Sequence, residues 1–226
     1  MAKTGEVNLD ILPPPQRRLW PELACVPKEF TLYGDTAIAL RLGHRESVDF
    51  DFFAFEDIDT HVLLMELPML EGALVQHSAP NTLSVLVETE EGPVRLSFFG
   101  LPRLRRIMPP MKASHGPHLA HMLDLAGMKM TTIQRRAEAK DYLDIHAILT
   151  RTDISVEAAV AAARVIYGAR FNPYDTLKAL SWFGEKQLQI LPNEVKQTLA
   201  TAAQHFDFRR MERLADEYAK RAEAGN

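Results

Sequence analysis

The sequence predicts an α+β protein in which strands come first and helices follow. Between residues 29 and 100, short β-prone runs alternate between apolar and polar side chains. From about Pro117 onward, apolar residues recur at helical spacing instead. A stretch rich in prolines and basic residues, Leu101 to Pro117, connects the two patterns. We therefore expect a mixed β-sheet with flanking helices, followed by an all-helical C-terminal part.

These patterns divide the 226 residues into three parts. Residues 1–14 are predicted to be a flexible tail, because the prolines at positions 13–15 interrupt regular structure. Residues 15–110 form the predicted α/β core, and residues 111–226 form the predicted helical domain.

The composition is ordinary for a water-soluble globular protein, with 46% hydrophobic and 25% charged residues. The single cysteine, Cys25, excludes an internal disulfide and a cysteine-based metal site. No apolar run is long enough to span a membrane, and the N-terminus lacks the apolar core of a signal peptide. We therefore expect a cytoplasmic protein without a membrane partner. The net charge of −4 argues against a uniformly basic nucleic-acid binder.

Local signals place the elements of the first part. A short helix is expected first, and strands follow wherever β-branched and aromatic residues gather. Two helices are expected between the strands. Asp35 or Thr36 can cap the first of them, and Gly43 can end it. Pro68 interrupts the second. The expected helices cover residues 17–26, 35–43 and 60–70, and the expected strands cover residues 30–34, 48–55, 73–78, 82–89 and 94–100, with turns at Asn81 and at Glu91-Gly92.

The second part begins with an apolar stripe at helical spacing, formed by Leu119, Met122, Leu123, Ala126, Met130 and Ile133. Similar periodicity predicts five more helices, over residues 140–149, 156–167, 174–183, 193–205 and 209–224.

The sharpest local feature is Asp49-Phe50-Asp51. Side chains of a strand alternate between its two faces, so Val48, Phe50 and Phe52 are expected in the core and the two aspartates together on the opposite face. Mg²⁺ prefers oxygen ligands and commonly takes one or two carboxylates plus substrate phosphates. The pair is therefore a candidate metal site. The competing interpretation is a solvated strand face on which aspartates are merely tolerated.

Upstream of this strand, Gly34-Asp35-Thr36 stands where a strand passes into a helix. A helix N-terminus offers backbone N–H groups and the positive end of its dipole to phosphate, and glycine lets the backbone approach closely. A strand, a glycine turn, a helix and then a strand with Asp-x-Asp is the arrangement of polymerase-beta-type nucleotidyltransferases, which this segment resembles.

The resemblance is closest to the AbiEii/AbiGii toxin family of nucleotidyltransferases. FTLYGDTAIALRLGHRESVDFDFF, from Phe30, is similar to the opening motif of that family. DLAGMKMTTIQRRAEAKDYLDIHAIL, from Asp124, is similar to a later motif, in which Lys-x-x-Ala-x-x-x-Arg is followed by Lys-Asp-x-x-Asp. Thr132 replaces the alanine of that pattern. The resemblance covers residues 30–149 and identifies residues 15–110 as the nucleotidyltransferase core.

The resemblance implies a function and a set of site residues. The reaction would transfer a nucleoside monophosphate from a nucleoside triphosphate to a hydroxyl of RNA, tRNA included, or of a protein. Mg²⁺, or Mn²⁺ in its place, would be the cofactor, and a cognate antitoxin would be a partner. The implied metal ligands are Asp49 and Asp51, the implied catalytic residues are Asp49, Asp51 and Asp141, and the implied substrate-binding residues are Gly34, Thr36, Arg45, Ser47, Lys129, Arg136 and Asp144.

Several of these residues also have a purely structural interpretation. Lys129 would extend from the edge of a buried face, Asp141 would serve as an N-terminal charge for its helix, and the loop with Arg45 and Ser47 would be solvated.

Two positions depart from the family pattern. Asp35 occupies a position that is usually glycine or serine, and Ser97 occupies the place of a third carboxylate. The alternative function is therefore a catalytically degenerate member of the fold that binds a nucleotide or a protein partner.

Overall fold

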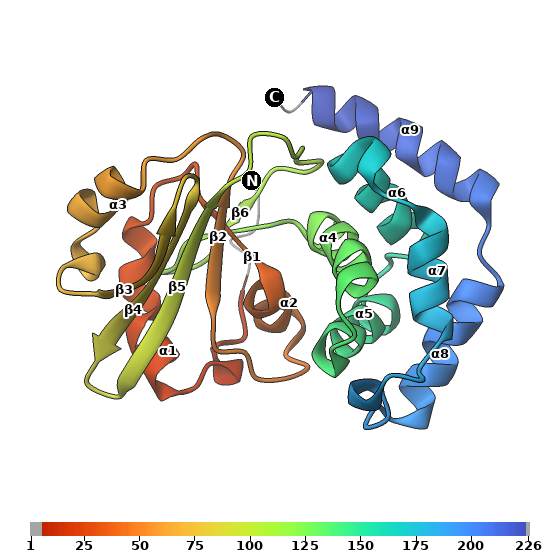
Figure 1. Ribbon diagram of the computed structural model, residues 1–226, viewed down its shortest axis with the longest axis horizontal. Helices are drawn as coiled ribbons and strands as arrows, with labels where there is room; N and C mark the ends of the chain where they lie inside the picture. Colours follow the sequence, from red (N-terminus) through yellow and green to blue (C-terminus); the bar gives the residue numbers. More distant parts are fainter. Residues whose placement is uncertain (1–5, 225–226) are drawn as a thin grey trace. The chain divides into compact units, whose positions relative to one another are not determined.

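The computed structural model describes residues 6–224, which form two compact units. The first unit contains the described residues up to Leu104 together with Pro110–Ala120, and it holds the sheet in Figure 1. The second unit contains Arg105–Pro109 and the described residues from His121 onward. The chain therefore passes from the first unit to the second, back again, and finally into the helices. No helix within residues 6–224 is both long and apolar enough to cross a membrane.

The first unit is built on a mixed sheet of seven strands, in the order β3-β4-β5-β2-β1-β7-β6 among the described residues. The pairs β2/β5 and β1/β7 are parallel, and the other neighbouring pairs are antiparallel. The predicted mixed sheet is thus confirmed. The strands are β1 (Thr31–Tyr33), β2 (Phe50–Ala54), β3 (Leu74–Ala79), β4 (Thr82–Thr89), β5 (Gly92–Gly100), β6 (Met111–Lys112) and β7 (His118–Leu119).

One face of the sheet forms the core of the first unit. Phe50 and Phe52 of β2 and Phe98 of β5 have no exposed surface, as strict alternation along a strand requires. The Phe52 and Phe98 rings stack with their centroids 5.2 Å apart, and Phe30 meets Phe98 edge to face. Asp51 and Ser97, which are register partners on β2 and β5, alternate with these phenylalanines and lie on the opposite face.

The N-terminal segment packs against the first unit, in contrast to the predicted tail. Residues 1–5 lie outside the described part of the chain, but Leu12 is 1% exposed and the Asn8 amide donates to the Leu40 carbonyl. Helix α1 begins at Pro14, because proline is tolerated in the first turn of a helix. The elements of this segment are η1 (Leu9–Ile11), α1 (Pro14–Leu19) and η2 (Trp20–Cys25).

Two helices interrupt the strands as predicted, with one difference in capping. Helix α2 (Gly34–Leu42) ends at Gly43 in the left-handed conformation. It begins one residue before the predicted caps, with Tyr33 at the N-cap, so Asp35 and Thr36 lie in its first turn and cap nothing. Helix α3 (Thr60–Glu66) is followed by η3 (Pro68–Leu70), which confirms the interruption at Pro68.

Strands β6 and β7 arise from the end of the predicted connector. Leu119 was expected on a helical stripe, but it lies in β7 beside Leu32 of β1. Residues 110–120 therefore belong with the sheet, although the sequence places the boundary of the helical domain at residue 111. Each of the two strands has only two residues, too few for a local periodic signal.

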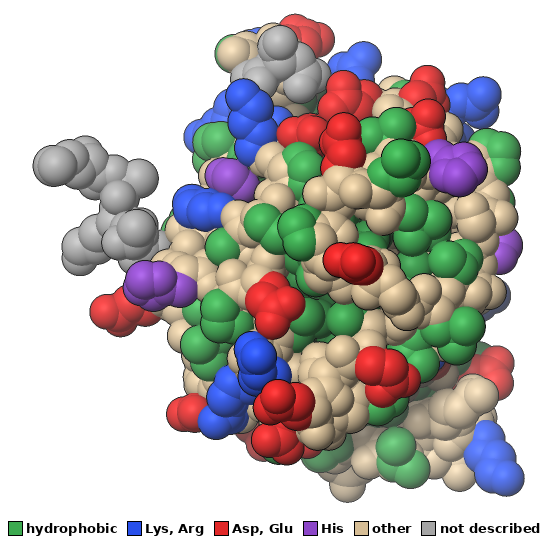
Figure 2. Space-filling model, turned by 90° about the vertical axis from the view of Figure 1, so that its left-hand side faces the viewer, with side chains coloured by type: hydrophobic (Ala, Val, Ile, Leu, Met, Phe, Trp, Pro, Cys, Tyr) green, Lys and Arg blue, Asp and Glu red, His purple; other side chains and the backbone are tan. Residues whose placement is uncertain are grey.

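Strand β3 forms one edge of the sheet, and its register with β4 shifts between Val75 and His77. Such an irregularity disturbs the row of backbone groups that an edge strand offers for further pairing. Leu74 and Val75 of β3 and Met65 of α3 are exposed. Figure 2 views this side and shows hydrophobic and acidic side chains interspersed on it.

The second unit is all-helical, which confirms the predicted C-terminal part. Helix α4 packs against α5, α6 and α7, and α9 packs on α6. The helices are α4 (Met122–Arg135), α5 (Ala139–Arg151), α6 (Val156–Tyr167), η4 (Gly168–Arg170), α7 (Pro173–Ser181), η5 (Lys186–Leu188), α8 (Asn193–Gln204) and α9 (Phe208–Ala224).

A buried carboxylate fastens the segment Arg105–Pro109 to α4. Asp124, in the first turn of α4, has no exposed surface. Its Oδ1 accepts from the Ile107 amide at 2.8 Å, and its Oδ2 accepts from the Met108 amide at 3.1 Å. Burial raises the pKa of Asp124 to about 6, although both amides and the charge of Arg106 act in the opposite direction.

This raised pKa predicts a pH dependence of stability. The unfolded pKa of aspartate is about 3.9, so the folded protein binds the Asp124 proton more tightly than the unfolded chain does. The contribution of Asp124 to the free energy of unfolding is therefore fully present below pH 4 and is lost as the pH rises through about 6. Relative to Asp124→Asn, the wild-type protein should gain about 1.4 kcal/mol between pH 8 and pH 5. Urea denaturation of both proteins measures this difference, and a constant difference across that range would contradict the assignment.

Candidate active-site residues

The two predicted metal-binding aspartates share one face of the sheet in the first unit. Asp51 lies beside Ser97 of β5, and Asp49 Oδ2 lies 3.8 Å from Nη1 of Arg95, two residues before Ser97. Both carboxylates are partly exposed, opposite the buried phenylalanines. Val48, expected in the core, is instead 49% exposed, because β2 begins two residues later. Arg95 was missed in the sequence, although it belongs to the same strand face as Ser97.

Gly34 is required where α2 begins beside β2. Its φ is +72°, which disfavours side chains, and a Cβ placed on it would lie 2.9 Å from Asp51 Oδ2. The absence of a side chain thus lets the Asp51 carboxylate lie directly against the turn. The predicted phosphate-binding turn at Gly34 therefore lies next to Asp51, one of the two predicted metal ligands.

Two buried hydroxyls fix the backbone just before Asp51. Thr36 Oγ1 donates a hydrogen bond to the Asp49 carbonyl, so Ser47 Oγ donates to Thr36 Oγ1, at 2.7 Å. Thr36 is 1% exposed and Ser47 is 7% exposed. These bonds hold the loop after α2 onto the first turn of that helix. The predicted contact of both residues with a substrate stays a prediction.

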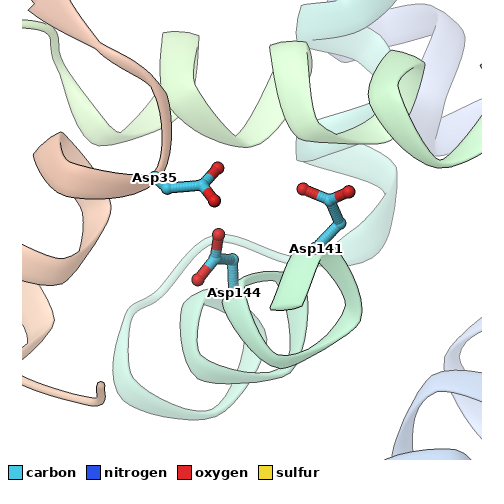
Figure 3. Close-up of side chains that lie close together, drawn as sticks. All are labelled: Asp35, Asp141 and Asp144. Carbon is cyan, nitrogen blue, oxygen red and sulfur yellow. The ribbon is translucent and has the colours of Figure 1, made fainter. Parts of the chain in front are cut away.

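The unusual acidic residue after Gly34 is matched by an arginine. Asp35, at the start of α2 (Figure 3), has its Oδ2 at 3.0 Å from Nη2 of Arg45, and both side chains are less than one-fifth exposed. The Arg45 Nη1 also donates to the Glu46 carbonyl at 2.9 Å. The positive charge of Arg45 thus offsets the charge by which Asp35 departs from the family pattern. A contact between Arg45 and phosphate stays a prediction.

The predicted residues of the second unit form a cluster of ion pairs, which we call the α4–α5 ion cluster (Lys129, Arg136, Asp141 and Asp144); three of the four are buried, and the Arg136 side chain is 43% exposed. Asp141 and Asp144 point to the same side of α5, as Figure 3 shows. Lys129 Nζ lies 2.6 Å from Asp141 Oδ1 and 2.7 Å from Asp144 Oδ2. Arg136 binds Asp141 with two nitrogens, Nε at 2.8 Å and Nη2 at 3.1 Å. Lys129 is 4% exposed, and both aspartates have no exposed surface.

This geometry refines the sequence hypotheses for the cluster. The two cations were expected to bind phosphate, and within the second unit they bind aspartates of α5. Asp141 was expected to act as a base, and its two carboxylate oxygens receive hydrogen bonds from Lys129 and Arg136. The structural interpretation of Lys129, in which it extends from the edge of a buried face, is wrong, because its ammonium group is itself buried between carboxylates. The catalytic and phosphate-binding roles stay predictions.

Comparisons with known proteins place this geometry in a known fold. The chain is similar to the solved structure of MenT4, a nucleotidyltransferase toxin from Mycobacterium tuberculosis, with a TM-score of 0.58 over 90% of this chain and 89% of that one. At 16% sequence identity, this similarity shows the fold alone. A 125-residue stretch is 29% identical to an uncharacterised protein of Aquifex aeolicus, and it covers 54% of this chain and 59% of that protein.

The fold and the residues together define a nucleotidyltransferase-type protein. Residues 23–224 match the family described as the nucleotidyl transferase AbiEii toxin of type IV toxin–antitoxin systems. The chain therefore belongs to the AbiEii family of nucleotidyltransferase toxins. The predicted family and fold class are confirmed, and the family match extends beyond residue 149 into the C-terminal helices.

The ion cluster makes a strong prediction for stability. Lys129→Met keeps the length of the side chain but leaves the charges of Asp141 and Asp144 buried without the ammonium group. Removing one partner of a buried pair costs about 3–5 kcal/mol, so the free energy of unfolding should fall by that amount. Lys140→Met is the matched control, because the Lys140 side chain is 44% exposed and lies 3.5 Å from Glu138.

The control substitution should change stability by less than about 1 kcal/mol, as is usual for exposed ion pairs. Urea denaturation followed by circular dichroism measures both values. Equal, small changes for the two variants would show that the α4–α5 ion cluster does not stabilise the second unit.

Proposed function

We propose that this chain transfers a nucleoside monophosphate from a nucleoside triphosphate to a hydroxyl group, with a divalent cation at Asp49 and Asp51. The observation that supports this most directly is the pair of partly exposed carboxylates on one sheet face, one of them directly against Gly34. Mg²⁺ and Mn²⁺ are hard ions that bind carboxylate oxygens, and two carboxylates with water and phosphate oxygens complete an octahedral shell. The donor set fits such an ion.

When bound, the cation would orient the triphosphate and offset negative charge on the reacting phosphate. The protein residues have separate roles in this proposal. The Thr36 and Ser47 hydroxyls hold the Asp49 backbone, and Gly34 leaves room for the Asp51 carboxylate. Arg45 offsets Asp35, so the start of α2 presents less negative charge to a triphosphate. Contacts of Gly34, Thr36, Arg45 and Ser47 with substrate are part of the proposal.

The reaction conserves atoms and charge as follows. The acceptor hydroxyl oxygen bonds to the α-phosphorus, the bond from that phosphorus to the bridging oxygen breaks, and pyrophosphate leaves. The hydroxyl proton passes to a base, the role that the family resemblance implies for Asp141. The resemblance likewise implies that Lys129 and Arg136 bind substrate phosphate, and each is a strong donor to phosphate oxygens. Ser97 supplies a neutral hydroxyl beside Asp51, which favours one cation over two.

Membership of the AbiEii toxin family suggests the class of acceptor and the kind of protein partner, but it identifies neither molecule. We propose an RNA, such as tRNA, or a protein as the acceptor, and a cognate antitoxin as the partner that restrains the activity. The alternative, a degenerate fold that only binds, is tested by the same experiments. Nucleotide binding without transfer to any acceptor would support it.

Removing the carboxylate of Asp49 or of Asp51 tests the proposed reaction. Asp49→Asn and Asp51→Asn should each reduce the labelling of RNA or protein by an α-labelled nucleoside triphosphate to the level without enzyme. Asp10→Asn is the control, because the Asp10 side chain in the same unit is 93% exposed. Circular dichroism should show intact folds for all three. Undiminished labelling by the Asp49 and Asp51 variants would contradict the proposed site, and so would wild-type labelling that survives EDTA.

Gly34 offers a second test with a matched control elsewhere in the first unit. Gly34 and Gly72 have nearly equal φ values of +72° and +74°, but a Cβ on Gly72 meets nothing within 4 Å. Gly34→Ala and Gly72→Ala should each cost about 1–2 kcal/mol through backbone strain. Only Gly34→Ala should displace the Asp51 carboxylate and lower the transfer rate. Equal transfer rates in the two variants would show that contact between Gly34 and Asp51 is not needed for function.

A further inference from the structure

A cavity of about 340 Å³ opens in the second unit, away from the residues assigned so far except Arg136. It lies where the end of α4 faces α5, α7 and η5. Its floor includes the buried side chains of Ile133, Tyr142 and Leu188. Its volume stands at the lower end of the range for small-molecule sites, which suits one small ligand group.

An exposed tryptophan forms one wall of this cavity. Trp182, the C-cap residue of α7, is 55% exposed, which is unusual for so large an apolar ring. Its ring packs against the backbone at Gly184, where an added Cβ would lie 2.6 Å from the ring atom Cζ2. The glycine thus allows the ring to approach the backbone closely. The same residue lines the cavity.

The rim of the cavity carries charged groups of both signs. Arg135, Arg136 and Lys178 line it, and so do Asp175 and Glu185. The Asp175 carboxylate already accepts a hydrogen bond from the Asn172 side chain at 3.0 Å. Lys178 lies one helical turn before Trp182, so its ammonium group and the ring flank the same opening. Arg136 also binds Asp141, which connects the rim to the α4–α5 ion cluster.

We propose that this cavity binds one nucleotide of a single-stranded RNA acceptor, with the base stacked on Trp182 and a phosphate held by Lys178 and Arg135. An aromatic platform beside cations is the arrangement by which proteins bind unpaired bases, because every base has a stacking face and every linkage carries a charge. This inference rests on the proposed transfer function and selects RNA as its acceptor. The same chemistry would accept a free nucleotide, which the experiment below distinguishes.

Fluorescence can follow this site directly, because the chain has two tryptophans and Trp20 is 1% exposed. In a Trp20→Phe protein, Trp182 is the remaining tryptophan. Without metal or triphosphate, a single-stranded RNA octamer should quench its emission saturably, and ATP at equal nucleotide concentration should quench it far less. Equal or stronger quenching by ATP would overturn the assignment to an RNA acceptor, and no quenching by either ligand would overturn the site itself.

Anisotropy of a labelled RNA octamer gives an independent measurement with Trp20 intact. Trp182→Ala should weaken RNA binding about 10-fold or more, and Trp182→Phe should restore most of it, because stacking needs an aromatic face. Lys178→Ala should weaken binding less and lower its salt dependence. Lys186→Ala is the control, since Lys186 is exposed on η5 but does not line the cavity. Unchanged affinity in Trp182→Ala would refute the inference.

The transfer assay separates this inference from the proposed function. Trp182→Ala should raise the KM for RNA and leave kcat nearly unchanged, because the residue binds the acceptor and does not take part in the chemistry. If the wild-type protein binds RNA through Trp182 but transfers no label, the transfer function fails while the binding site stands. If it transfers label equally well with Trp182→Ala, the site fails while the transfer function stands.

Discussion

The second unit depends on the neutralisation of two carboxylates that have no contact with solvent. Asp141 and Asp144 are fully buried, and Lys129 with Arg136 brings two positive charges to them within 2.6 to 3.1 Å. A buried ion pair contributes little net stability, but leaving one partner alone is severely unfavourable. The four residues must therefore be present together. This requirement fixes α4 against α5, and it places the Arg136 guanidinium at the rim of the cavity that Trp182 lines.

In the first unit, the acidic residues of the candidate metal site, Asp49 and Asp51, are partly exposed on one side of the sheet rather than buried. The Thr36 hydroxyl, which itself accepts from Ser47, binds the Asp49 backbone, Arg95 lies 3.8 Å from the Asp49 carboxylate, and Gly34 leaves room for the Asp51 carboxylate. Carboxylates that remain partly exposed on one face can bind a cation from solution, whereas the carboxylates of the second unit are buried against Lys129 and Arg136. The exposure of the carboxylates thus distinguishes the proposed metal ligands of the first unit from the ion-paired aspartates of the second.

The sequence predicted the elements with clear local periodicity and missed features that depend on distant partners. Alternation around Phe50 and Phe52 predicted the carboxylate face. The family resemblance put Ser97 at the position of a third carboxylate, and the structure places it beside Asp51. Strands β6 and β7 were missed because two-residue strands have no period. Strand β7 pairs with β1, about 90 residues away in sequence, and β6 pairs only with β7 among the described strands. The partners of Lys129 and the burial of Asp124 were missed for a related reason: a charged residue in a helix looks the same in sequence whether it faces solvent or a buried partner. Trp182 gave no signal, since only the fold reveals that its ring is exposed beside a cavity.

The most direct test of the account is to locate the cation. Crystals grown with Mn²⁺ and a non-hydrolysable nucleoside triphosphate analogue should give an anomalous peak within bonding distance of carboxylate oxygens of both Asp49 and Asp51, with the triphosphate on the same ion. The peak should vanish in crystals of Asp51→Asn. A bound nucleotide whose Mn²⁺ lies on other residues, or on no protein carboxylate, would contradict the assignment of the metal-binding residues.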